Sequence, residues 1–336
     1  MEEDRRASER SGTVSDTAPL HILCSEREAP LLAPLLPTLE RAIKLCHPGD
    51  DTAAHIEAAF ISRDVTGRST KFEIMPDTER FYTALRAAPN LQWLHVHSAG
   101  IDRDFYQQQQ QRGVRVTASH GASDAVVAQS ALTGLLALAR KLPQILQAQQ
   151  QRSWEPLLGE GKTPRDLQGQ HAVVVGWGGI GQRIGQLLQV LGLEVSVARH
   201  SGEPVGPDLR TVRYDQLHEV LPTASWLILA CPLTDATRGL ISADLLALLP
   251  AHACVINVAR GHVIDEPALV QALQGGRLGG AFLDVFYHEP LPADSPIWGL
   301  KNVIASPHSA GFSDGNAARV RQIFANKLQL WAQGSL

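Results

Sequence analysis

The sequence has few cysteines and no long uninterrupted apolar run. Only four of its 336 residues are cysteine, and no two of them form a C-x-x-C pair. Three lie in or beside apolar runs, which fits reduced thiols in a reducing compartment and argues against a disulfide framework. The longest apolar stretch, residues 131–146, is interrupted by Arg140, Lys141 and Pro143. It is therefore too short to span a bilayer.

The chain also lacks an excess of charge of one sign. Its formal net charge is −4 and its pI is about 6.3, which gives no general attraction to nucleic acid or to an anionic membrane. The first 19 residues mix acids with bases and contain no apolar segment of the kind found in secretory signals. We therefore expect residues 1–19 to form a disordered tail. We also expect a cytoplasmic protein whose partners include neither nucleic acid nor a membrane.

The composition is that of a globular protein, and the chain is long enough for two domains. Short β-rich runs alternate with helical patterns, which is typical of an α/β fold with parallel sheets. We expect strands at LHILCS, IKLCH, AAFISR, LQWLHVHS and VRVTAS, and then at HAVVVG, EVSVA, SWLILA, ACVINVA, GAFLDV and NVIASPH. The second set is more uniformly apolar, as strands buried on both faces are. A long helical segment, Asp124 to about Gln151, separates the two sets and is placed to link the domains or to pack between subunits.

A glycine-rich turn follows the first strand of the second set. Gly176, Gly178 and Gly181 have G-x-G-x-x-G spacing, and apolar residues then recur at helical intervals from Ile180 to Leu191. In a dinucleotide-binding βα unit the first glycine makes the tight turn, the second lets pyrophosphate approach and the third lets the helix pack on the strand. The N-terminus of the helix then holds the anion. The pattern predicts a Rossmann-type NAD(P) site.

A basic residue stands where this fingerprint usually has an acid. The next strand ends at Arg199, about 20 residues after the first glycine, where a carboxylate usually binds the ribose of NAD. Arginine instead offers a planar fork of donors to a phosphate, and His200 and Ser201 add further donors. We therefore expect NADP(H) to be preferred, with NAD(H) also usable. A surface arginine without a ligand is the alternative.

Four charged or titratable residues follow the later strands. Arg260 follows CVINVA, Asp284 ends GAFLD, Glu289 lies five residues further on, and His308 closes NVIASPH. Open α/β sheets bind ligands at the carboxyl ends of their strands. The set suggests an anion-binding cation with a histidine–carboxylate pair for proton transfer. Taken singly, a loop histidine is more often merely exposed, and a loop acid often caps a helix.

Six segments together make a specific resemblance. SAGID (98–102), GWGGIG, CPLTDATRGLI, NVARG, LDVFYHEP and SPHSAG resemble, in order and spacing, the D-isomer-specific 2-hydroxyacid dehydrogenase family, in particular its NADP-type glyoxylate/hydroxypyruvate reductases. The resemblance runs from about Leu91 to the C-terminus. It implies a flavodoxin-like substrate-binding domain (20–120 plus 310–336) and a doubly wound Rossmann cofactor domain (121–309). It also implies an active site between the domains, with hinges near 119–123 and 307–311, and a homodimer formed largely through the cofactor domains.

The resemblance further implies residue roles. Arg260 matches the arginine that binds the carboxylate and carbonyl oxygen of a 2-keto acid. His308, paired with Glu289, matches the acid in reduction and the base in oxidation. The substrate carboxylate would be bound by Ser98, Ala99 and Gly100. The implied cofactor contacts are Gly176, Gly178, Gly179, Ile180, Gly181, Arg199, His200, Ser201, Cys231, Pro232, Thr237, Val258, Ala259, Asp284 and His308.

The expected activity is the reduction of small 2-keto acids, such as glyoxylate or hydroxypyruvate, to D-2-hydroxy acids with NADPH. Arg260 would stabilise the charge that develops on the carbonyl oxygen while His308 supplies the proton, and the carboxylate of Glu289 favours the imidazolium. Glu289 argues against formate oxidation, because family members with that activity lack it. The alternative is a dinucleotide-sensing, corepressor-like binding protein with little turnover, since the same fold serves both.

Two features stand apart from the family pattern. Gln129 and Ser130 occupy positions where many relatives carry an acid and an aromatic residue or histidine. His95 and His97 alternate along one strand, so their side chains share a face. Such a pair can bind zinc, but no third ligand is suggested. We therefore expect sheet histidines beside the substrate loop and no metal site.

Overall fold

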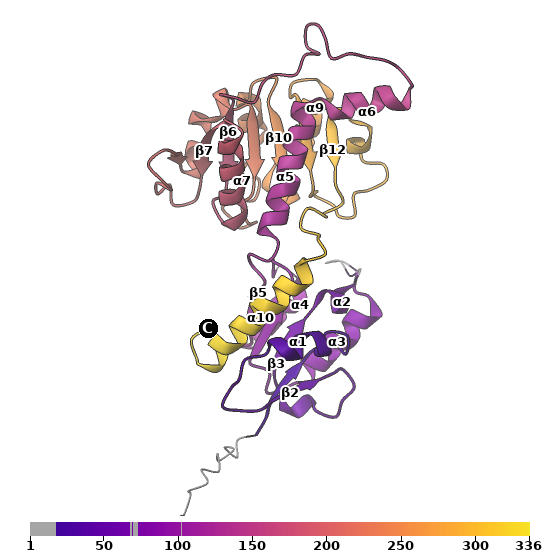
Figure 1. The fold of residues 1–336 in the computed structure, drawn as a ribbon, viewed down its shortest axis with the longest axis vertical. Helices are drawn as coiled ribbons and strands as arrows, with labels where there is room; N and C mark the ends of the chain where they lie inside the picture. Colours follow the sequence, from indigo (N-terminus) through magenta and orange to yellow (C-terminus); the bar gives the residue numbers. More distant parts are fainter. Residues whose placement is uncertain (1–17, 68, 70–72, 102) are drawn as a thin grey trace, which may run out of the picture. The chain divides into compact units, whose positions relative to one another are not determined.

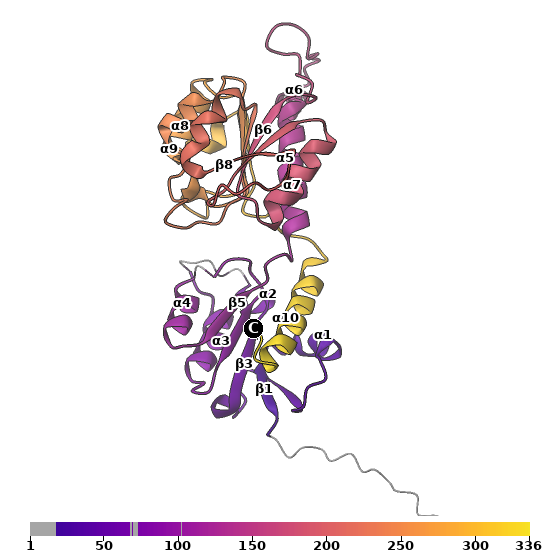
Figure 2. The same ribbon diagram turned by 90° about the vertical axis from the view of Figure 1, so that its left-hand side faces the viewer.

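The computed structural model describes residues 18–67, 69, 73–101 and 103–336. Residues 1–17 of the expected tail and Asp102 of the SAGID segment lie outside them. The chain divides into two compact units. Unit 1 comprises residues up to Ala122 together with Asp314–Leu336, and unit 2 comprises Ser123–Ser313 (Figures 1 and 2). Each unit is built on one parallel sheet, which confirms the predicted α/β class.

Unit 1 contains a five-stranded sheet in the order β2-β1-β3-β4-β5. The strands are β1 (Leu20–Leu23), β2 (Ile43–Cys46), β3 (Ile56–Ile61), β4 (Trp93–Val96) and β5 (Arg115–Ala118). All neighbouring pairs are parallel. This is the strand order of flavodoxin-like sheets. Each of these strands overlaps one of the five runs predicted from the sequence, although β3 begins two residues before the run AAFISR (58–63).

Helices cover both faces of this sheet (Figure 2). One face carries α2 (Arg63–Thr66), α3 (Pro76–Arg86) and α4 (Asp104–Gln111), and the other carries α1 (Ala29–Leu32) and α10 (Asn316–Ala332). On the second face the ring of Trp93 stacks on Phe324 at 5.1 Å and on Trp331 at 5.6 Å. Because α10 follows unit 2 in the sequence, segments from before and after unit 2 both contribute to the core of unit 1.

Unit 2 contains a seven-stranded sheet in the order β12-β11-β10-β9-β6-β7-β8. The strands are β6 (His171–Val175), β7 (Glu194–Ala198), β8 (Arg210–Val212), β9 (Trp226–Leu229), β10 (Cys254–Asn257), β11 (Gly280–Leu283) and β12 (Val303–Ala305). From β8 to β11 this is the order of the dinucleotide-binding fold, with β12 added at one edge. The sequence predicted every strand except β8, which has only three residues.

The sheet of unit 2 is buried on both faces. Helices α5 (Asp124–Ala139) and α7 (Gly179–Val190) pack on one face, and α8 (Ala243–Leu248) and α9 (Glu266–Gln274) pack on the other. Strand residues alternate between the two cores, which explains why the sequences of these strands are so uniformly apolar. The short 3₁₀ helices of the chain are η1 (Ala33–Leu35), η2 (Ala53–His55), η3 (Tyr214–Glu219), η4 (Leu221–Thr223), η5 (Gly261–Val263) and η6 (Pro296–Gly299).

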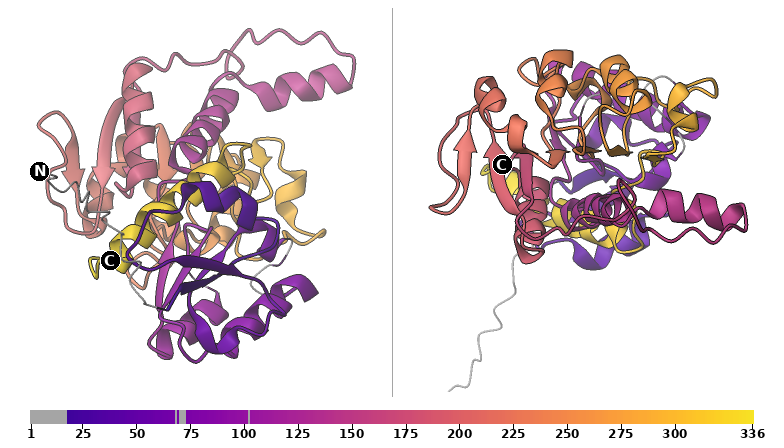
Figure 3. Two further views of the ribbon diagram at one scale, coloured as in Figure 1. Left: turned by 60° about the horizontal axis from the view of Figure 1, so that its bottom comes forward. Right: turned by 90° about the horizontal axis from the view of Figure 1, so that it is seen from above.

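The helical segment predicted from Asp124 to about Gln151 is two helices. After α5 the backbone of Lys141 is left-handed (φ 57°), and α6 (Leu142–Gln150) starts with Pro143 in its first turn, at 67° to α5. Helix α6 and the chain after it project from the rest of unit 2 (Figure 3). Among the described residues no single helix is long and apolar enough to cross a membrane. The bent pair α5 and α6 passes that test by length and composition only.

Candidate active site

The loop between β6 and α7 has the shape that pyrophosphate binding requires. Gly176 has a φ of +97°, and a Cβ there would lie 2.7 Å from the backbone of Cys231. A Cβ at Gly181 would overlap the carbonyl oxygen of Gly176, whereas one at Gly178 would meet nothing within 4 Å. The fold itself therefore requires the first and third glycines. The second faces open space at the N-terminus of α7, which is where a pyrophosphate would approach the backbone.

The other residues of this loop start the helix. Gly179 and Ile180 form the first turn of α7. A Cβ on Gly179 would overlap the carboxylate of Asp124, the first residue of α5. The two helices therefore approach each other closely at their N-termini, and the glycine run permits that approach.

The predicted phosphate-binding residues form a tight turn after β7. The backbone N–H of Gly202 donates to the carbonyl of Arg199 at 3.3 Å, and the N–H of Arg199 donates to the carbonyl of Val212 on β8 at 3.0 Å. Arg199 is half-buried, while His200 and Ser201 are exposed. The three side chains therefore lie at the carboxyl edge of the sheet, where dinucleotide-binding sheets hold the adenosine ribose.

The segment after β9 contributes mainly through its backbone and shape. Cys231 is buried, and burial raises the pKa of its thiol to about 12. The hydroxyl of Thr237 donates to the carbonyl of Pro232 at 2.6 Å and accepts from the N–H of Thr234 at 2.8 Å. Thr237 therefore closes this loop, and the backbone of Cys231 lies against the glycine turn.

Arg260 is placed by a network of backbone contacts after β10. The side chain of Asn257 donates to the carbonyl of Arg260 at 3.2 Å and accepts from the N–H of Ala259 at 3.1 Å. The predicted cofactor-contact residues Val258 and Ala259 are buried here. A Cβ on Gly261 would overlap the backbone of Phe286. The glycine that follows Arg260 thus lets this strand end pack against the segment that leads to Glu289.

Glu289 and His308 form a hydrogen-bonded pair. Nδ1 of His308 donates to Oε2 of Glu289 at 2.7 Å, and the N–H of Phe286 donates to Oε1 at 3.0 Å. Burial raises the pKa of Glu289, but the hydrogen bond and charge of His308, the N–H of Phe286 and the charge of Arg260 outweigh it and lower the pKa. The carboxylate is therefore held ionised against the imidazole.

Asp284 holds the segment that carries His308. Its side chain is buried, and Oδ1 accepts from the N–H groups of Ser309 and Ala310 at 2.8 and 3.0 Å. The hydroxyl of Ser130 donates to the carbonyl of Ala310 at 2.9 Å from the side of α5. His308 has a φ of +49°, a left-handed backbone that surrounding contacts must maintain in a non-glycine residue. This anchoring was not foreseen, because an acid at a strand end gives the same sequence signal whether it contacts a cofactor or a neighbouring loop.

Three predicted residues thus follow adjacent strands. Arg260, Asp284 and His308 come after β10, β11 and β12, which pair in parallel. The predicted substrate loop belongs to unit 1 and follows β4. There the hydroxyl of Ser98 donates to the carbonyl of Gly100 at 2.6 Å, and Ala99 is exposed. The segment 307–311, expected as a hinge, is tied to unit 2 by the contacts of Asp284 and Ser130, and the chain leaves unit 2 after Ser313.

Comparison with known proteins assigns the family. The model of the family described as "D-isomer specific 2-hydroxyacid dehydrogenase, NAD binding domain" matches residues 132–310, more than half of the chain. The chain belongs to this family. A glyoxylate/hydroxypyruvate reductase B from Yersinia pestis (strain Pestoides F) is 31% identical over 226 residues, which are 67% of this chain and 69% of that protein. A glyoxylate reductase from Korarchaeum cryptofilum (strain OPF8) is 29% identical over 74% of this chain and 76% of its own length.

A solved structure extends the likeness to both units. The D-isomer specific 2-hydroxyacid dehydrogenase from Xanthobacter autotrophicus Py2, crystallised with NADPH and MES, superimposes with a TM-score of 0.73 at 25% identity. The match covers 95% of this chain and 96% of that one. The protein is thus an oxidoreductase with an NAD(P)-binding Rossmann domain, and its substrate class is that of small 2-hydroxy or 2-keto acids.

In this 2-hydroxyacid dehydrogenase, His95 lies in β4 and His97 directly follows that strand. Both imidazole rings form hydrogen bonds with hydroxyl groups. The ring nitrogens of His95 lie 2.8 Å from Oγ1 of Thr117 and 2.9 Å from Oγ of Ser119, and Nε2 of His97 lies 3.0 Å from Oγ1 of Thr66. Burial lowers the pKa of His95 to about 3 and that of His97 to about 4. No group of three or more metal-binding side chains occurs in the part of the chain that the structure describes.

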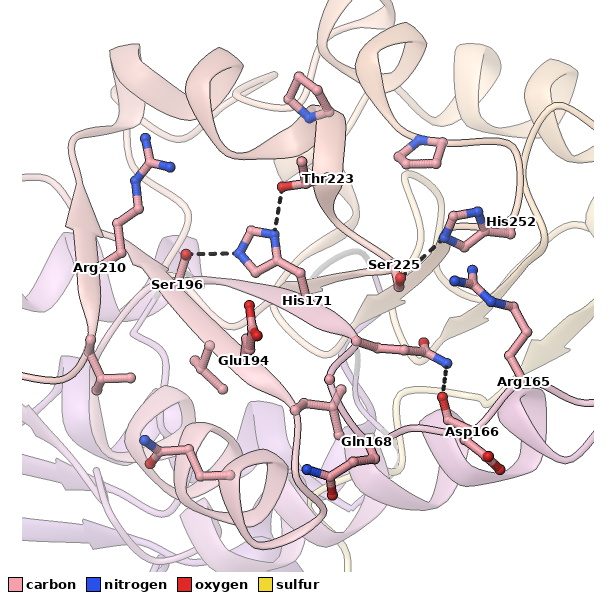
Figure 4. A pocket seen from close by; sticks show the side chains of 18 of the residues that line it. Arg165, Asp166, Gln168, His171, Glu194, Ser196, Arg210, Thr223, Ser225 and His252 are labelled. Carbon is pink, nitrogen blue, oxygen red and sulfur yellow. Dashed lines mark hydrogen bonds between the residues drawn. The ribbon is translucent and has the colours of Figure 1, made fainter.

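Unit 2 of the dehydrogenase also has a surface pocket of about 1000 Å³ at the amino ends of its strands (Figure 4). The ring nitrogens of His171 lie 2.9 Å from Oγ1 of Thr223 and 2.8 Å from Oγ of Ser196. Nε2 of His252 lies 3.1 Å from Oγ of Ser225. These polar groups therefore pair with one another. The pocket lies at the edge of the sheet opposite the glycine loop, so it is distinct from the candidate active site.

Proposed function

We propose that the protein reduces small 2-keto acids, such as glyoxylate or hydroxypyruvate, to D-2-hydroxy acids with NADPH. The observation that carries this proposal is the 2.7 Å hydrogen bond between His308 and Glu289. His308 follows β12, and Asp284 follows the neighbouring strand β11. Bound NADPH supplies the hydride that reduces C2 of the keto acid. The protein's own contribution is to bind and orient the acid and to supply a proton to its carbonyl oxygen.

His308 is the proposed proton donor. Its Nδ1 atom is held by Glu289, so Nε2 is the ring atom that gives the proton in reduction and takes it back in oxidation. The carboxylate of Glu289, whose pKa is lowered, stays ionised and stabilises the imidazolium. The pair therefore fixes the orientation of the imidazole and leaves Nε2 as the ring atom that can face the carbonyl oxygen of the substrate.

Arg260 is the proposed anion-binding residue. Its guanidinium binds the carboxylate of the keto acid and stabilises the negative charge that develops on the carbonyl oxygen. Backbone N–H groups of the loop Ser98–Gly100 supply further donors to the carboxylate. In this assignment residues 20–120 with 310–336 form the substrate-binding domain, and residues 121–309 form the cofactor domain.

The glycine loop and the turn at Arg199 are the proposed cofactor site. The open space at Gly178 and the close packing at Gly176 and Gly181 fit a pyrophosphate at the N-terminus of α7. Arg199 in place of an acid supports a preference for NADP(H), because a guanidinium attracts the 2′-phosphate that a carboxylate would repel.

We also propose a homodimer formed largely through the cofactor domains. The support is a group of exposed apolar side chains on α6 and the chain that follows it: Leu142, Ile145, Leu146, Trp154 and Leu158. Trp154 is 95% exposed in the single chain, which is unusual for tryptophan and typical of an interaction site. The four cysteines are free and buried, which supports a reducing compartment such as the cytoplasm.

A steady-state screen of 2-keto acids with NADPH and NADH tests the function. We expect turnover of small keto acids, with NADPH favoured by roughly ten- to a hundredfold, as charge-assisted hydrogen bonds to a phosphate predict. Absence of turnover with every keto acid, together with tight dinucleotide binding, would contradict the reductase and favour the dinucleotide-sensing binding protein.

A further inference from the structure

Two arginines lie side by side at the carboxyl edge of unit 2. Strands β7 and β8 are parallel neighbours, and their last paired residues are Ala198 and Val212. The next residues are Arg199 and Arg213, and the N–H of Arg199 donates to the carbonyl of Val212. The edge strand β8 was not expected from the sequence, so Arg213 gave no signal as a partner of Arg199.

The side chain of Arg213 runs along the turn that follows Arg199. Gly202 ends this turn with a φ of +67°, and a Cβ there would overlap Cγ of Arg213. The glycine thus lets the methylene groups of Arg213 pass directly over the turn. Nε of Arg213 donates to Oδ1 of Asp215 at 3.2 Å on the exposed surface. That bond uses Nε, whereas the terminal Nη1 and Nη2 donors are the ones that commonly take a phosphate oxygen.

Tyr214 directly follows Arg213 and lies beside His200 of this turn. Its ring lies 6.2 Å from that of His200, and it is half-buried. Burial and the neighbouring Cys231 raise the pKa of Tyr214 to about 12, with Arg199 opposing this shift. Tyr214 packs against the core that includes Cys231, whose backbone lies against the glycine loop.

We propose that Arg213 is a second arginine for the 2′-phosphate of NADP(H), acting together with Arg199. This proposal rests on the proposed NADPH-dependent function. Two guanidinium groups on adjacent strand ends give the doubly charged phosphate two cations, and Gly202 leaves room for the side chain of Arg213 to lie along the turn that follows Arg199. Asp215 orients the guanidinium of Arg213 through Nε.

The test is direct binding of two adenosine nucleotides to the full-length protein by titration calorimetry. 2′,5′-ADP carries the 2′-phosphate, and 5′-AMP lacks it. We expect Arg213→Gln to weaken binding of 2′,5′-ADP by about 10- to 100-fold and to leave 5′-AMP unchanged. Arg213→Lys keeps the charge and the methylene packing, and we expect a smaller loss. Arg210→Gln is the matched control, because Arg210 is an exposed arginine at the opposite end of β8, paired with Glu219.

The outcomes separate this proposal from the one on which it rests. If the wild type binds 2′,5′-ADP no better than 5′-AMP, the NADPH preference fails and the role of Arg213 fails with it. If the wild type prefers 2′,5′-ADP and Arg213→Gln keeps the full preference, only the role of Arg213 is overturned. Equal weakening of both nucleotides would assign Arg213 a structural role and would also overturn it. Circular dichroism of Arg213→Lys and Arg213→Gln shows whether both variants are folded.

Discussion

Glu289 is fixed through both of its carboxylate oxygens, and one of them holds Nδ1 of His308 at 2.7 Å. The imidazole therefore has its tautomer and orientation set before any substrate binds. This relationship joins two loops that are 19 residues apart in the sequence. It depends on β11 and β12 being neighbours in the sheet.

Replacing His308 by alanine removes the proposed proton donor. We expect kcat to fall by about 100- to 10,000-fold, the usual contribution of general acid catalysis, with little change in NADPH affinity. Steady-state kinetics and fluorescence titration of NADPH measure the two quantities. Glu289→Gln keeps the shape and loses the charge, so we expect it to lose less activity. Normal turnover in His308→Ala would contradict the acid assignment.

Asp284 anchors the segment 308–310 and gives a second prediction. Asp284→Asn places an amide N–H₂ against backbone N–H groups and leaves buried donors unsatisfied, which costs about 1–3 kcal/mol of unfolding free energy. We expect kcat to fall as well, because the left-handed backbone of His308 loses its support. Ser130→Ala removes one neutral hydrogen bond to Ala310 and should cost only about 1 kcal/mol. Urea denaturation compares the variants, and equal stability of Asp284→Asn and the wild type would refute the anchoring role.

The two glycines at positions 178 and 181 should respond oppositely to alanine. A methyl group at Gly181 overlaps the carbonyl oxygen of Gly176, so overpacking should destabilise the fold by about 1–3 kcal/mol. A methyl group at Gly178 meets nothing within 4 Å, so that variant should fold normally. It should nevertheless weaken NADPH binding by about tenfold or more, which corresponds to 1.4 kcal/mol. Thermal unfolding and dinucleotide titration measure both effects, and normal cofactor binding by Gly178→Ala would argue against a pyrophosphate at this turn.

Cofactor preference should change with Arg199. Arg199→Asp restores the carboxylate usual at this strand end, which accepts hydrogen bonds from ribose and repels a 2′-phosphate. We expect the ratio of kcat/KM for NADPH over NADH to fall by about tenfold or more. An unchanged ratio would show that Arg199 does not hold the phosphate.

Acid should destabilise unit 1 through its buried histidines. Burial lowers the pKa values of His95 and His97 to about 3 and about 4, below the ordinary value of 6.5. The unfolded chain therefore binds more protons as the pH falls below about 6.5, and the free energy of unfolding decreases with decreasing pH. Each histidine contributes a slope of about 1.4 kcal/mol per pH unit until its folded pKa is reached. Denaturation curves between pH 7 and 5 measure the slope, and His95→Asn should reduce it.

Much of the fold could be predicted because its signals are local. Continuous apolar runs marked the strands, and the glycine spacing marked the turn before α7. The strand β8 was missed because its three residues, Arg210–Val212, include a charged and a polar side chain and so form no apolar run, unlike the equally short β12. The break at Lys141 was underestimated, because helical periodicity continues across it and only Pro143 signals the interruption.

The candidate site was predictable in its residue types but not in its supports. Arg260, Glu289 and His308 stood out because they follow apolar strands in a known order. The contacts of Ser130 and Asp284 with Ala310 join residues that are 180 and 26 positions apart. Such contacts depend on tertiary packing, which no local sequence pattern encodes.

The position of α10 has a consequence for the order in which the protein folds during synthesis. Trp93 is completely buried, with Phe324 and Trp331 stacked on it, and α10, which carries both, follows all of unit 2 in the sequence. Unit 2 is continuous in sequence, so it can fold as soon as residue 313 has left the ribosome. Strands β1–β5 are synthesised before unit 2, yet Trp93 of β4 is covered only after α10 has been made. Until α10 is made, the face of the sheet that carries Trp93 lacks the residues of α10 that cover it in the folded unit.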